Sequence, residues 1–282
     1  YQFHLQWHAL KQYANSRGIR IIGDVPIYVP LDSADVWANV KYFQIDDKYN
    51  PINVAGCPPD DFTADGQLWG NPVYNYKALE QDGYSWWIKR MQESLKMYDV
   101  VRIDHFRGFE AYWSIPYGSL TAKSGHWVKG PNVKLFKTME KAIPNMNIIA
   151  EDLGLLTEGV YQMIAKLKYP GMKVLEFGFD PWGNSDHAPH NIVENAIVYT
   201  SSHDLPTIKD WFNNLSYDHK RYVLEYLRLD NEYFVTEAMI ETALSSIGKM
   251  VIVPLQDYLE LGEEGRMNTP STLGQNWKWR AY

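Results

Sequence analysis

Short apolar runs alternate along the chain with segments in which apolar residues recur every three or four positions. The runs predict six strands, at residues 19–25, 100–104, 147–153, 172–180, 196–204 and 250–257. The helical spacing predicts helices near residues 3–16, 83–97, 133–142, 157–168, 217–228 and 235–247. Strands that alternate with helices indicate a parallel sheet of βα units, and therefore an α/β fold.

Two connections between these elements are too long to be simple loops. Residues 26–80 are rich in Pro, Gly, Asp and aromatic side chains, and residues 109–131 form the second long connection. Each follows the C-terminal end of a predicted strand, where barrels and open α/β sheets keep their active sites. Both connections are therefore expected to be insertions at a functional face.

Acidic residues stand at the ends of the predicted strands. They are Asp24, Asp104, Glu151, Asp180, Asp204 and Asp257. Any one of them could cap a following helix or lie in a solvated loop. Six carboxylates at the same structural position favour a closed barrel, because a barrel gathers its strand ends around one pocket and an open sheet spreads them out.

A (β/α)8 TIM-type barrel has eight strands, two more than the sequence predicts. The chain also begins with Tyr1 rather than Met. We therefore expect residues 1–282 to be the C-terminal portion of a single catalytic barrel domain. Strands 3 to 8 would be present, the first two strands would precede this chain, and the insertions would lie at about 26–80 and 109–131.

Composition narrows the class of partner. The 282 residues carry a net charge of −7, which argues against nucleic acid or an anionic membrane surface, and no stretch is apolar for long enough to span a bilayer. The single cysteine, Cys57, excludes an intrachain disulfide and a zinc site built from several thiolates. It also favours a reduced, cytoplasmic protein.

The segment DVVRIDHFRGF places unusual charge directly after apolar residues. Arg102 and Asp104 share one face of a strand, so the guanidinium would favour the ionised carboxylate that a covalent nucleophile needs. Glu151 follows the apolar run IIA, where burial would keep a carboxyl protonated as a general acid. Such a pair suits retaining glycoside chemistry.

Other interpretations of these residues remain open. Arg102 could be a structural ion-pair partner, and His203 a buried histidine beside Asp204 with no chemical role. Clustered carboxylates can also bind metal, but no HExxH or EF-hand spacing occurs. Phosphate-binding GxxxxGK[ST] and GxGxxG loops and the GxSxG serine motif are absent too. No metal and no cofactor are predicted.

Four segments in this order, GIRIIGDVPIYV, VRIDHFRGFEAYW, IIAEDLG and SSHD, resemble the signature regions of the α-amylase clan. Their form is similar to that of the amylomaltase family, the 4-α-glucanotransferases or disproportionating enzymes. Further matches are DSADVW, GCPPDDFTADGQLWGNP, PGMKVLEFGFD and GRMNTPSTLGQNWKWR, so the resemblance covers essentially the whole chain. It implies a catalytic barrel with inserted subdomains.

The resemblance also implies roles for individual residues. Asp104 would form the glucosyl-enzyme intermediate, Glu151 would be the acid/base, and Asp204 would stabilise the transition state. The remaining sugar-binding positions would be Asp24, Arg102, His203 and, on the GQLWGNP loop, the aromatic platform Trp69. The implied partners are malto-oligosaccharides, glucose and starch- or glycogen-derived glucans.

Two departures from the family pattern affect the expected subsites. Leu205 and Pro206 follow Asp204 where further polar residues are common, and Asp61 stands where an aromatic residue often follows PPD. The same carboxylates would also serve a glucan hydrolase of the clan. A transferase needs loops and aromatic acceptor platforms that exclude water, for which Trp69 and Tyr74 are candidates. A barrel that binds glucans without catalysis is the third alternative.

Overall fold

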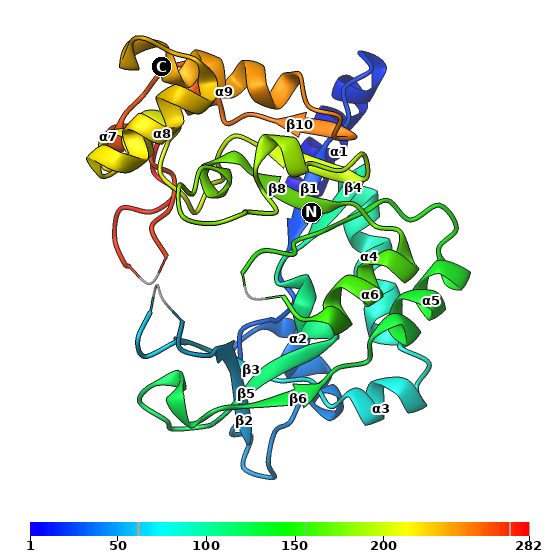
Figure 1. Ribbon diagram of the computed structural model, residues 1–282. Helices are drawn as coiled ribbons and strands as arrows, with labels where there is room; N and C mark the ends of the chain where they lie inside the picture. The colour runs from blue at the N-terminus through cyan, green and yellow to red at the C-terminus, as the bar shows by residue number, and fades with distance from the viewer. Residues whose placement is uncertain (61–62, 155, 271, 282) are drawn as a thin grey trace. The chain divides into compact units, whose positions relative to one another are not determined.

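The computed structural model describes residues 1–60, 63–154, 156–270 and 272–281, and these fall into two compact units. Unit 1 covers residues 1–169 and unit 2 covers residues 170–282. Both units combine helices with parallel strands, so the predicted α/β class is confirmed. Figure 1 follows the chain through both units from blue to red.

The parallel sheet of unit 1 has the order β1-β4-β7, with β1 at Ile22–Val25, β4 at Val100–Ile103 and β7 at Ile148–Ala150. Its helices are α1 (Gln2–Ser16), α4 (Ser85–Met97), α5 (Val133–Ala142) and α6 (Glu158–Leu167). Helix α4 lies beside β1, β4 and α5 (Figure 1). These elements match the strands and helices predicted for this half, apart from a few terminal residues.

The two long connections supply a second sheet that the sequence did not predict. It is antiparallel, with the order β3-β2-β5-β6. The strands are β2 (Asn53–Cys57), β3 (Gln67–Pro72), β5 (Ala111–Pro116) and β6 (His126–Lys129). Gly56 interrupts β2, Gly70 and Pro72 lie in β3, and Pro116 ends β5, while β6 has only four residues, so no segment shows the alternation that marks a strand. The short helices α2 (Ala34–Ala38) and α3 (Tyr76–Gln81) also lie in the first connection.

Aromatic side chains dominate the core of unit 1. Four rings pack together there, each with its centroid no more than 6.0 Å from that of another ring in the set: Phe43, Tyr74, Trp86 and Trp87. Tyr74 is fully buried, and its hydroxyl donates to the carbonyl of Ile27 at 2.6 Å. The expectation that Tyr74 forms an acceptor platform is therefore wrong, because its ring is enclosed by the core.

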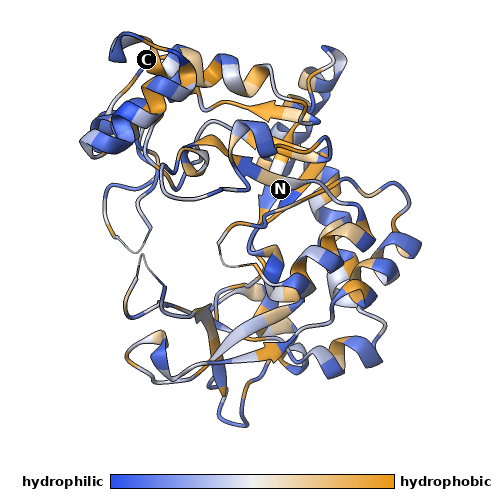
Figure 2. Cartoon of the chain, in the orientation of Figure 1, coloured by the Kyte–Doolittle hydropathy of each residue, from blue (hydrophilic) through white to orange (hydrophobic). Residues whose placement is uncertain are grey.

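The parallel sheet of unit 2 has the order β10-β9-β8, with β8 at Gly171–Val174, β9 at Ala196–Tyr199 and β10 at Met250–Ile252. Its helices are α7 (Ile208–Asn213), α8 (Tyr217–Leu227), α9 (Val235–Leu244) and α10 (Leu255–Tyr258). Apolar residues, orange in Figure 2, dominate β10 and much of α9. Buried Met239 and Val235 of α9 join the core that contains Val198 of β9.

The strands of unit 2 end earlier than predicted. Residues Leu175–Gly178 form a 3-10 turn after β8, and Pro254 caps α10 shortly after β10. Proline donates no backbone hydrogen bond, so it cannot continue the ladder. Asp180, Asp204 and Asp257 therefore do not stand at strand ends, and the predicted set of six carboxylates at equivalent positions is wrong for these three.

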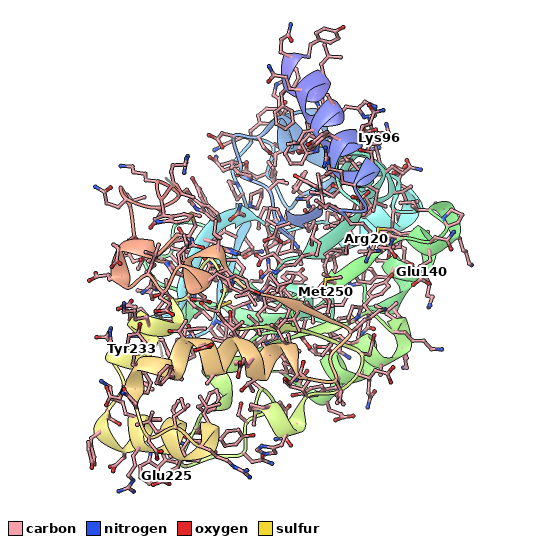
Figure 3. The ribbon with its side chains drawn as sticks, turned by 90° about the horizontal axis from the view of Figure 1, so that it is seen from above. Arg20, Lys96, Glu140, Glu225, Tyr233 and Met250 are labelled. Atoms are coloured by element: carbon pink, nitrogen blue, oxygen red, sulfur yellow. The ribbon has the colours of Figure 1, made fainter. Side chains whose placement is uncertain are left out.

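Charged side chains cover the outer faces of the helices. In Figure 3, Lys96 marks α4, Glu140 marks α5 and Glu225 marks α8. Lys96 lies 2.6 Å from Glu93, and Glu225 lies 3.5 Å from Arg221. Such exposed pairs contribute little to stability. Among the described residues, no helix has the length and hydropathy that crossing a bilayer needs.

Candidate active site

Strands β1 and β4 of unit 1 bring three charged side chains together. Asp24 lies opposite Arg102 in the parallel register, and Asp104 follows two residues later on the same face. Nη1 of Arg102 donates to Oδ2 of Asp24 at 2.6 Å and to Oδ1 of Asp104 at 3.1 Å. The Arg102 side chain is 11% exposed, whereas those of Asp24 and Asp104 are 43% and 44% exposed. A buried cation therefore holds two carboxylates that remain open to a ligand.

The charge of Arg102 is secured by its neighbours. Burial alone would lower the pKa of Arg102, but the negative charges of Asp24, Asp104 and Glu151 outweigh that effect and raise it. The guanidinium consequently stays protonated beside Asp104. An adjacent fixed cation favours the ionised form of a carboxylate, which is the form that attacks as a nucleophile.

Glu151 follows β7 and is buried. Its Oε2 accepts from the backbone N–H of His105 at 2.6 Å, and its Oε1 accepts from that of Leu153 at 2.8 Å. Burial and, to a lesser extent, the charge of Asp104 raise the pKa of Glu151 to about 7, against the opposing effects of Arg102 and the two backbone donors. Glu151 can therefore hold a proton near neutral pH. When it gives up that proton, the carboxylate that remains already accepts two backbone hydrogen bonds.

His105 acts through its backbone. The residue has a left-handed conformation (φ 51°), which directs its N–H to Glu151. Burial, assisted by the charge of Arg107, lowers the pKa of His105 to about 3, so its ring is neutral. Sequence reasoning gave His105 no role, and a backbone donor leaves no signal in the residue type that could have revealed it.

Arg107 and Cys57 occupy the same unit without an evident chemical task. The buried guanidinium of Arg107 lies 4.0 Å from the ring centroid of Trp127, a cation–π contact that joins the segment after β4 to β6. Burial raises the pKa of Cys57 to about 12, so the thiol stays protonated and is a poor nucleophile.

Trp69 of β3 lies beside His105, the residue whose backbone N–H donates to Glu151. Its ring packs edge-on against that of His105 with centroids 4.8 Å apart, and Nε1 donates to Oε1 of Gln67 at 3.0 Å. The side chain is half-buried, so part of it stays open to a ligand. Asp61, which stands where the family pattern often has an aromatic residue, lies outside the described residues.

Unit 2 holds His203 and Asp204 on the loop after β9. Nε2 of His203 lies 3.2 Å from Oδ2 of Asp204, while Nδ2 of Asn268 donates to Oδ1 at 2.6 Å. Nη2 of Arg266 donates to the Asp204 carbonyl at 3.4 Å. Sequence reasoning noticed the segment GRMNTPSTLGQNWKWR but assigned no role to these two residues. Residue type alone does not reveal such partners, because the contact spans 64 positions.

The other acids of unit 2 have structural surroundings. Asp180 is exposed and accepts from the backbone N–H of Trp182 at 2.9 Å. Asp257 is buried, and it accepts from Thr200 and from the backbone of Ile208. Glu176 is also buried, and burial together with the charge of Asp257 raises the pKa of Glu176 well above its ordinary value. Glu176 lies inside the predicted strand 172–180, so the sequence pattern does not single it out, whereas the structure places it in a 3-10 turn.

Metal coordination finds no support in the described ranges. No group of three or more His, Cys, Asp or Glu side chains in them is arranged to hold a metal ion. The carboxylates of Asp24, Asp104, Glu151 and Asp204 instead accept hydrogen bonds from a guanidinium, an amide or backbone N–H groups.

Comparison with known proteins gives consistent results. A family model described as 4-alpha-glucanotransferase matches residues 1–282. The chain is 50% identical over 281 residues to the 4-alpha-glucanotransferase of Streptococcus pneumoniae serotype 4, covering 99% of this chain and 56% of that protein. It is 46% identical over 283 residues to that of Clostridium butyricum, covering 100% of this chain and 58% of that protein. The chain thus spans somewhat more than half the length of these relatives.

Solved structures agree with the sequence matches. The amylomaltase of Streptococcus agalactiae, in complex with acarbose, superposes with a TM-score of 0.96 at 44% identity, covering 99% of this chain and 57% of that one. The amylomaltase of Corynebacterium glutamicum gives a TM-score of 0.79 at 18% identity, covering 97% of this chain and 44% of that one, which shows a shared fold.

Proposed function

Because this chain belongs to glycoside hydrolase family 77, the 4-alpha-glucanotransferases, we propose that the protein transfers α-1,4-glucan segments between malto-oligosaccharides. The observation that carries the proposal is the pair of unequal carboxyl groups in unit 1. Asp104 lies 3.1 Å from a buried arginine, whereas burial raises the pKa of Glu151 to about 7. One group is thereby suited to attack and the other to proton transfer.

The first step of this proposal is glycosyl transfer to the enzyme. A carboxylate oxygen of Asp104 attacks the anomeric carbon of the donor glucan and forms a covalent ester. The bond from that carbon to the glycosidic oxygen breaks, and the leaving oxygen takes the proton of Glu151. Arg102 donates to Oδ1 of Asp104 and orients the carboxylate for the attack.

The second step returns the glucan to an acceptor. The carboxylate of Glu151 takes the proton of an acceptor hydroxyl, whose oxygen attacks the anomeric carbon and displaces Asp104 with retention. Between the steps Glu151 is ionised, and the N–H groups of His105 and Leu153 stabilise that charge. Neither step of this proposal needs a metal or a cofactor.

The family motifs extend the proposal to further residues. We assign Asp204 the stabilisation of positive charge on the sugar ring, and Asp24 and His203 contacts to sugar hydroxyls. Trp69 would stack on an acceptor sugar, an assignment supported by its place beside His105. The partners would be malto-oligosaccharides, glucose and starch- or glycogen-derived glucans, rather than nucleic acid or membrane. A cytoplasmic location remains a prediction from composition.

We further propose that residues 1–282 form the C-terminal portion of one (β/α)8 barrel, with the insertions at about 26–80 and 109–131. Two strands that precede this chain would complete it. Both parallel sheets are open at their edges among the described residues, β1 and β7 in one and β10 and β8 in the other, so the free edges of β1 and β10 could pair with two further strands. Helix α1, all of whose residues are described, buries no side chain. A cavity of about 550 Å³ also lies beside β1, lined in part by Val25, Trp86 and Arg90.

Maltotriose distinguishes transfer from hydrolysis. Transfer exchanges one glycosidic bond for another, so the purified full-length protein should yield glucose and longer oligosaccharides with a constant number of reducing ends. If reducing ends rise in step with product, the protein is a hydrolase. If maltotriose binds but is not consumed, the protein is a glucan-binding module and the proposed activity is wrong.

A further inference from the structure

The loop that carries Asp204 has no regular structure and is fixed by side-chain hydrogen bonds. Buried Asp257 joins its two ends, since Oδ2 accepts from Oγ1 of Thr200 at 2.8 Å and Oδ1 accepts from the N–H of Ile208 at 2.9 Å. Within the loop, Oγ of Ser201 donates to the carbonyl of Pro206 at 2.5 Å. These three bonds fix the path of the backbone but do not reach the carboxylate of Asp204.

The Asp204 carboxylate contacts a different segment. The Asp204 side chain is 42% exposed, and the terminal torsion of an aspartate turns easily unless something holds it. Nδ2 of Asn268 donates to Oδ1 at 2.6 Å, and Nε2 of His203 lies 3.2 Å from Oδ2. Two chemically different neighbours on the two oxygens define the plane of the carboxylate.

Arg266 fixes the backbones of both Asp204 and Asn268. Its Nη2 donates to the carbonyl of Asp204 at 3.4 Å, and its Nε donates to the carbonyl of Asn268 at 3.1 Å. The loop that carries Asp204 and the segment that carries Asn268 are thus joined twice. The Arg266 side chain links their main chains, and the amide of Asn268 bonds to the carboxylate of Asp204. A displacement of one would have to carry the other with it.

We propose that Asn268 is a positioning residue that orients the carboxylate of Asp204 through the bond from Nδ2 to Oδ1, with Arg266 holding the two backbones in register. This inference rests on the proposed function, in which Asp204 stabilises the transition state. An ionised carboxylate only accepts hydrogen bonds, so the amide nitrogen of Asn268 must face it. A neutral amide orients the carboxylate without cancelling its charge, and that charge remains available to a developing cation.

The same segment offers a matched control. Asn276 closes the turn beyond Asn268, since its Oδ1 accepts from the N–H of Thr269 at 3.0 Å and its Nδ2 donates to the carbonyl of Thr272 at 3.1 Å. No contact of Asn276 given by the structure reaches Asp204 among the described residues. Replacing Asn276 by Ala therefore loosens the segment while leaving the bond from Asn268 in place.

The test compares Asn268→Ala, Asn268→Asp and Asn276→Ala in the full-length protein, with kcat and KM for maltotriose measured between about pH 5 and about pH 8. For Asn268→Ala we expect kcat to fall about 10- to 100-fold with KM nearly unchanged, the range known for losing a hydrogen-bond partner that orients a metal ligand, applied here to a partner that orients a carboxylate. For Asn276→Ala we expect a lower midpoint of unfolding but a much smaller loss of kcat.

Asn268→Asp distinguishes a positioning role from a merely structural one, because only a positioning role predicts that kcat relative to the wild type changes with pH. At neutral pH the introduced carboxylate repels Asp204 and donates nothing, so the loss of kcat should be severe. At acidic pH the introduced carboxyl is protonated and can donate again, so kcat relative to the wild type should rise as pH falls. His203 and Arg266 face Asp204, and Glu176 interacts with Arg266; all three are common to both proteins and cancel in the ratio.

The outcomes separate the inference from the function on which it rests. Any one of three results would overturn the role of Asn268. They are a wild-type kcat in Asn268→Ala, a kcat ratio of Asn268→Asp to wild type that does not change with pH, and a loss of kcat in Asn276→Ala equal to that in Asn268→Ala. If Asn268→Ala fails to fold, the pH ratio of Asn268→Asp decides alone. A wild type that only hydrolyses maltotriose refutes the proposed transfer, while its hydrolysis rate still measures Asn268. Full activity in Asp204→Asn refutes both.

Discussion

The two units hold the carboxylates to which we assign catalytic roles in different ways. In unit 1, Asp24 lies within β1 and Asp104 follows β4 directly, so backbone register with the neighbouring strand sets their position. In unit 2, Asp204 lies five residues beyond the end of β9, and side chains from distant segments fix it. Register survives most substitutions, whereas a side-chain clamp fails when one residue changes. Substituting Asp104 or Glu151 in unit 1 should therefore remove chemistry directly, whereas substituting Asn268, which contacts the Asp204 carboxylate in unit 2, should act through positioning.

The largest effect should come from Asp104→Asn. An amide cannot form the covalent intermediate, so we expect kcat to fall by about 10⁴-fold or more. Glucan binding, measured by calorimetry with maltotriose, should persist, since Arg102 still holds Asp24. Retained turnover would show that Asp104 is not the nucleophile.

Glu151→Gln should cost about 10²- to 10⁴-fold in kcat, because the amide cannot donate a proton to the leaving oxygen. In the wild type, kcat/KM should decline as pH rises through about 7, where buried Glu151 loses its proton. A pH–rate profile of both proteins checks this, and an alkaline limb that persists in Glu151→Gln would assign it to another group.

Stability provides an independent measure of the same carboxyl. The pKa of Glu151 is raised in the folded protein to about 7 from an ordinary value of 4.5. The folded state thus binds the proton more tightly than the unfolded state does. The contribution of Glu151 to the free energy of unfolding is therefore fully present below about pH 4.5 and is lost as pH rises through about 7. Urea unfolding at acidic and alkaline pH should show this decline in the wild type relative to Glu151→Gln.

Arg102→Lys should have an intermediate effect. Lysine keeps the positive charge, but a single ammonium does not reproduce the planar geometry with which Arg102 bridges Asp24 and Asp104. We expect kcat to fall about 10- to 100-fold, as is usual when a partner that orients a reactive group is lost. The exposed Arg221, changed to Lys in the same way, should leave kcat unaltered, and an equal loss in both variants would remove the case for Arg102.

Asp257→Ala should have the smallest effect on chemistry and the clearest effect on folding. It leaves Thr200 and the backbone of Ile208 without their buried acceptor, which costs about 1–3 kcal/mol per unsatisfied group. Thr200→Val removes only one of the two bonds and should destabilise less. If urea unfolding gives the same free energy for Asp257→Ala and the wild type, the loop does not depend on this clamp.

Sequence patterns predicted the parallel strands and helices because their periodicity is local. The shared face of Arg102 and Asp104 follows from the same local pattern, and so does the burial of Glu151 after three apolar residues. The pairing of Arg102 with Asp24 was not predicted, because it joins strands 78 positions apart. The antiparallel sheet escaped prediction because its strands are short and two of them contain Gly. The ends of β8 and β10 were misplaced because apolar side chains continue into a 3-10 turn and a short helix.

Contacts between distant positions could not be predicted from local patterns. Asn268 meets Asp204 across 64 residues, and His105 reaches Glu151 through a backbone N–H that any residue type could supply. Tyr74 illustrates the opposite error, since an aromatic residue in a polar segment suggested a ligand platform and proved to be core. Partners of this kind become visible only when the fold brings them together.

The most direct test of the account is covalent trapping at Asp104. An α-glucosyl fluoride with a second fluorine on the sugar ring loses fluoride without needing a proton, while the added fluorine slows release of the intermediate. Full-length protein treated with this reagent should carry one glucosyl group, and peptide mass spectrometry should locate it on Asp104. A label on another carboxylate, or turnover of maltotriose with inverted configuration by NMR, would contradict the proposed mechanism.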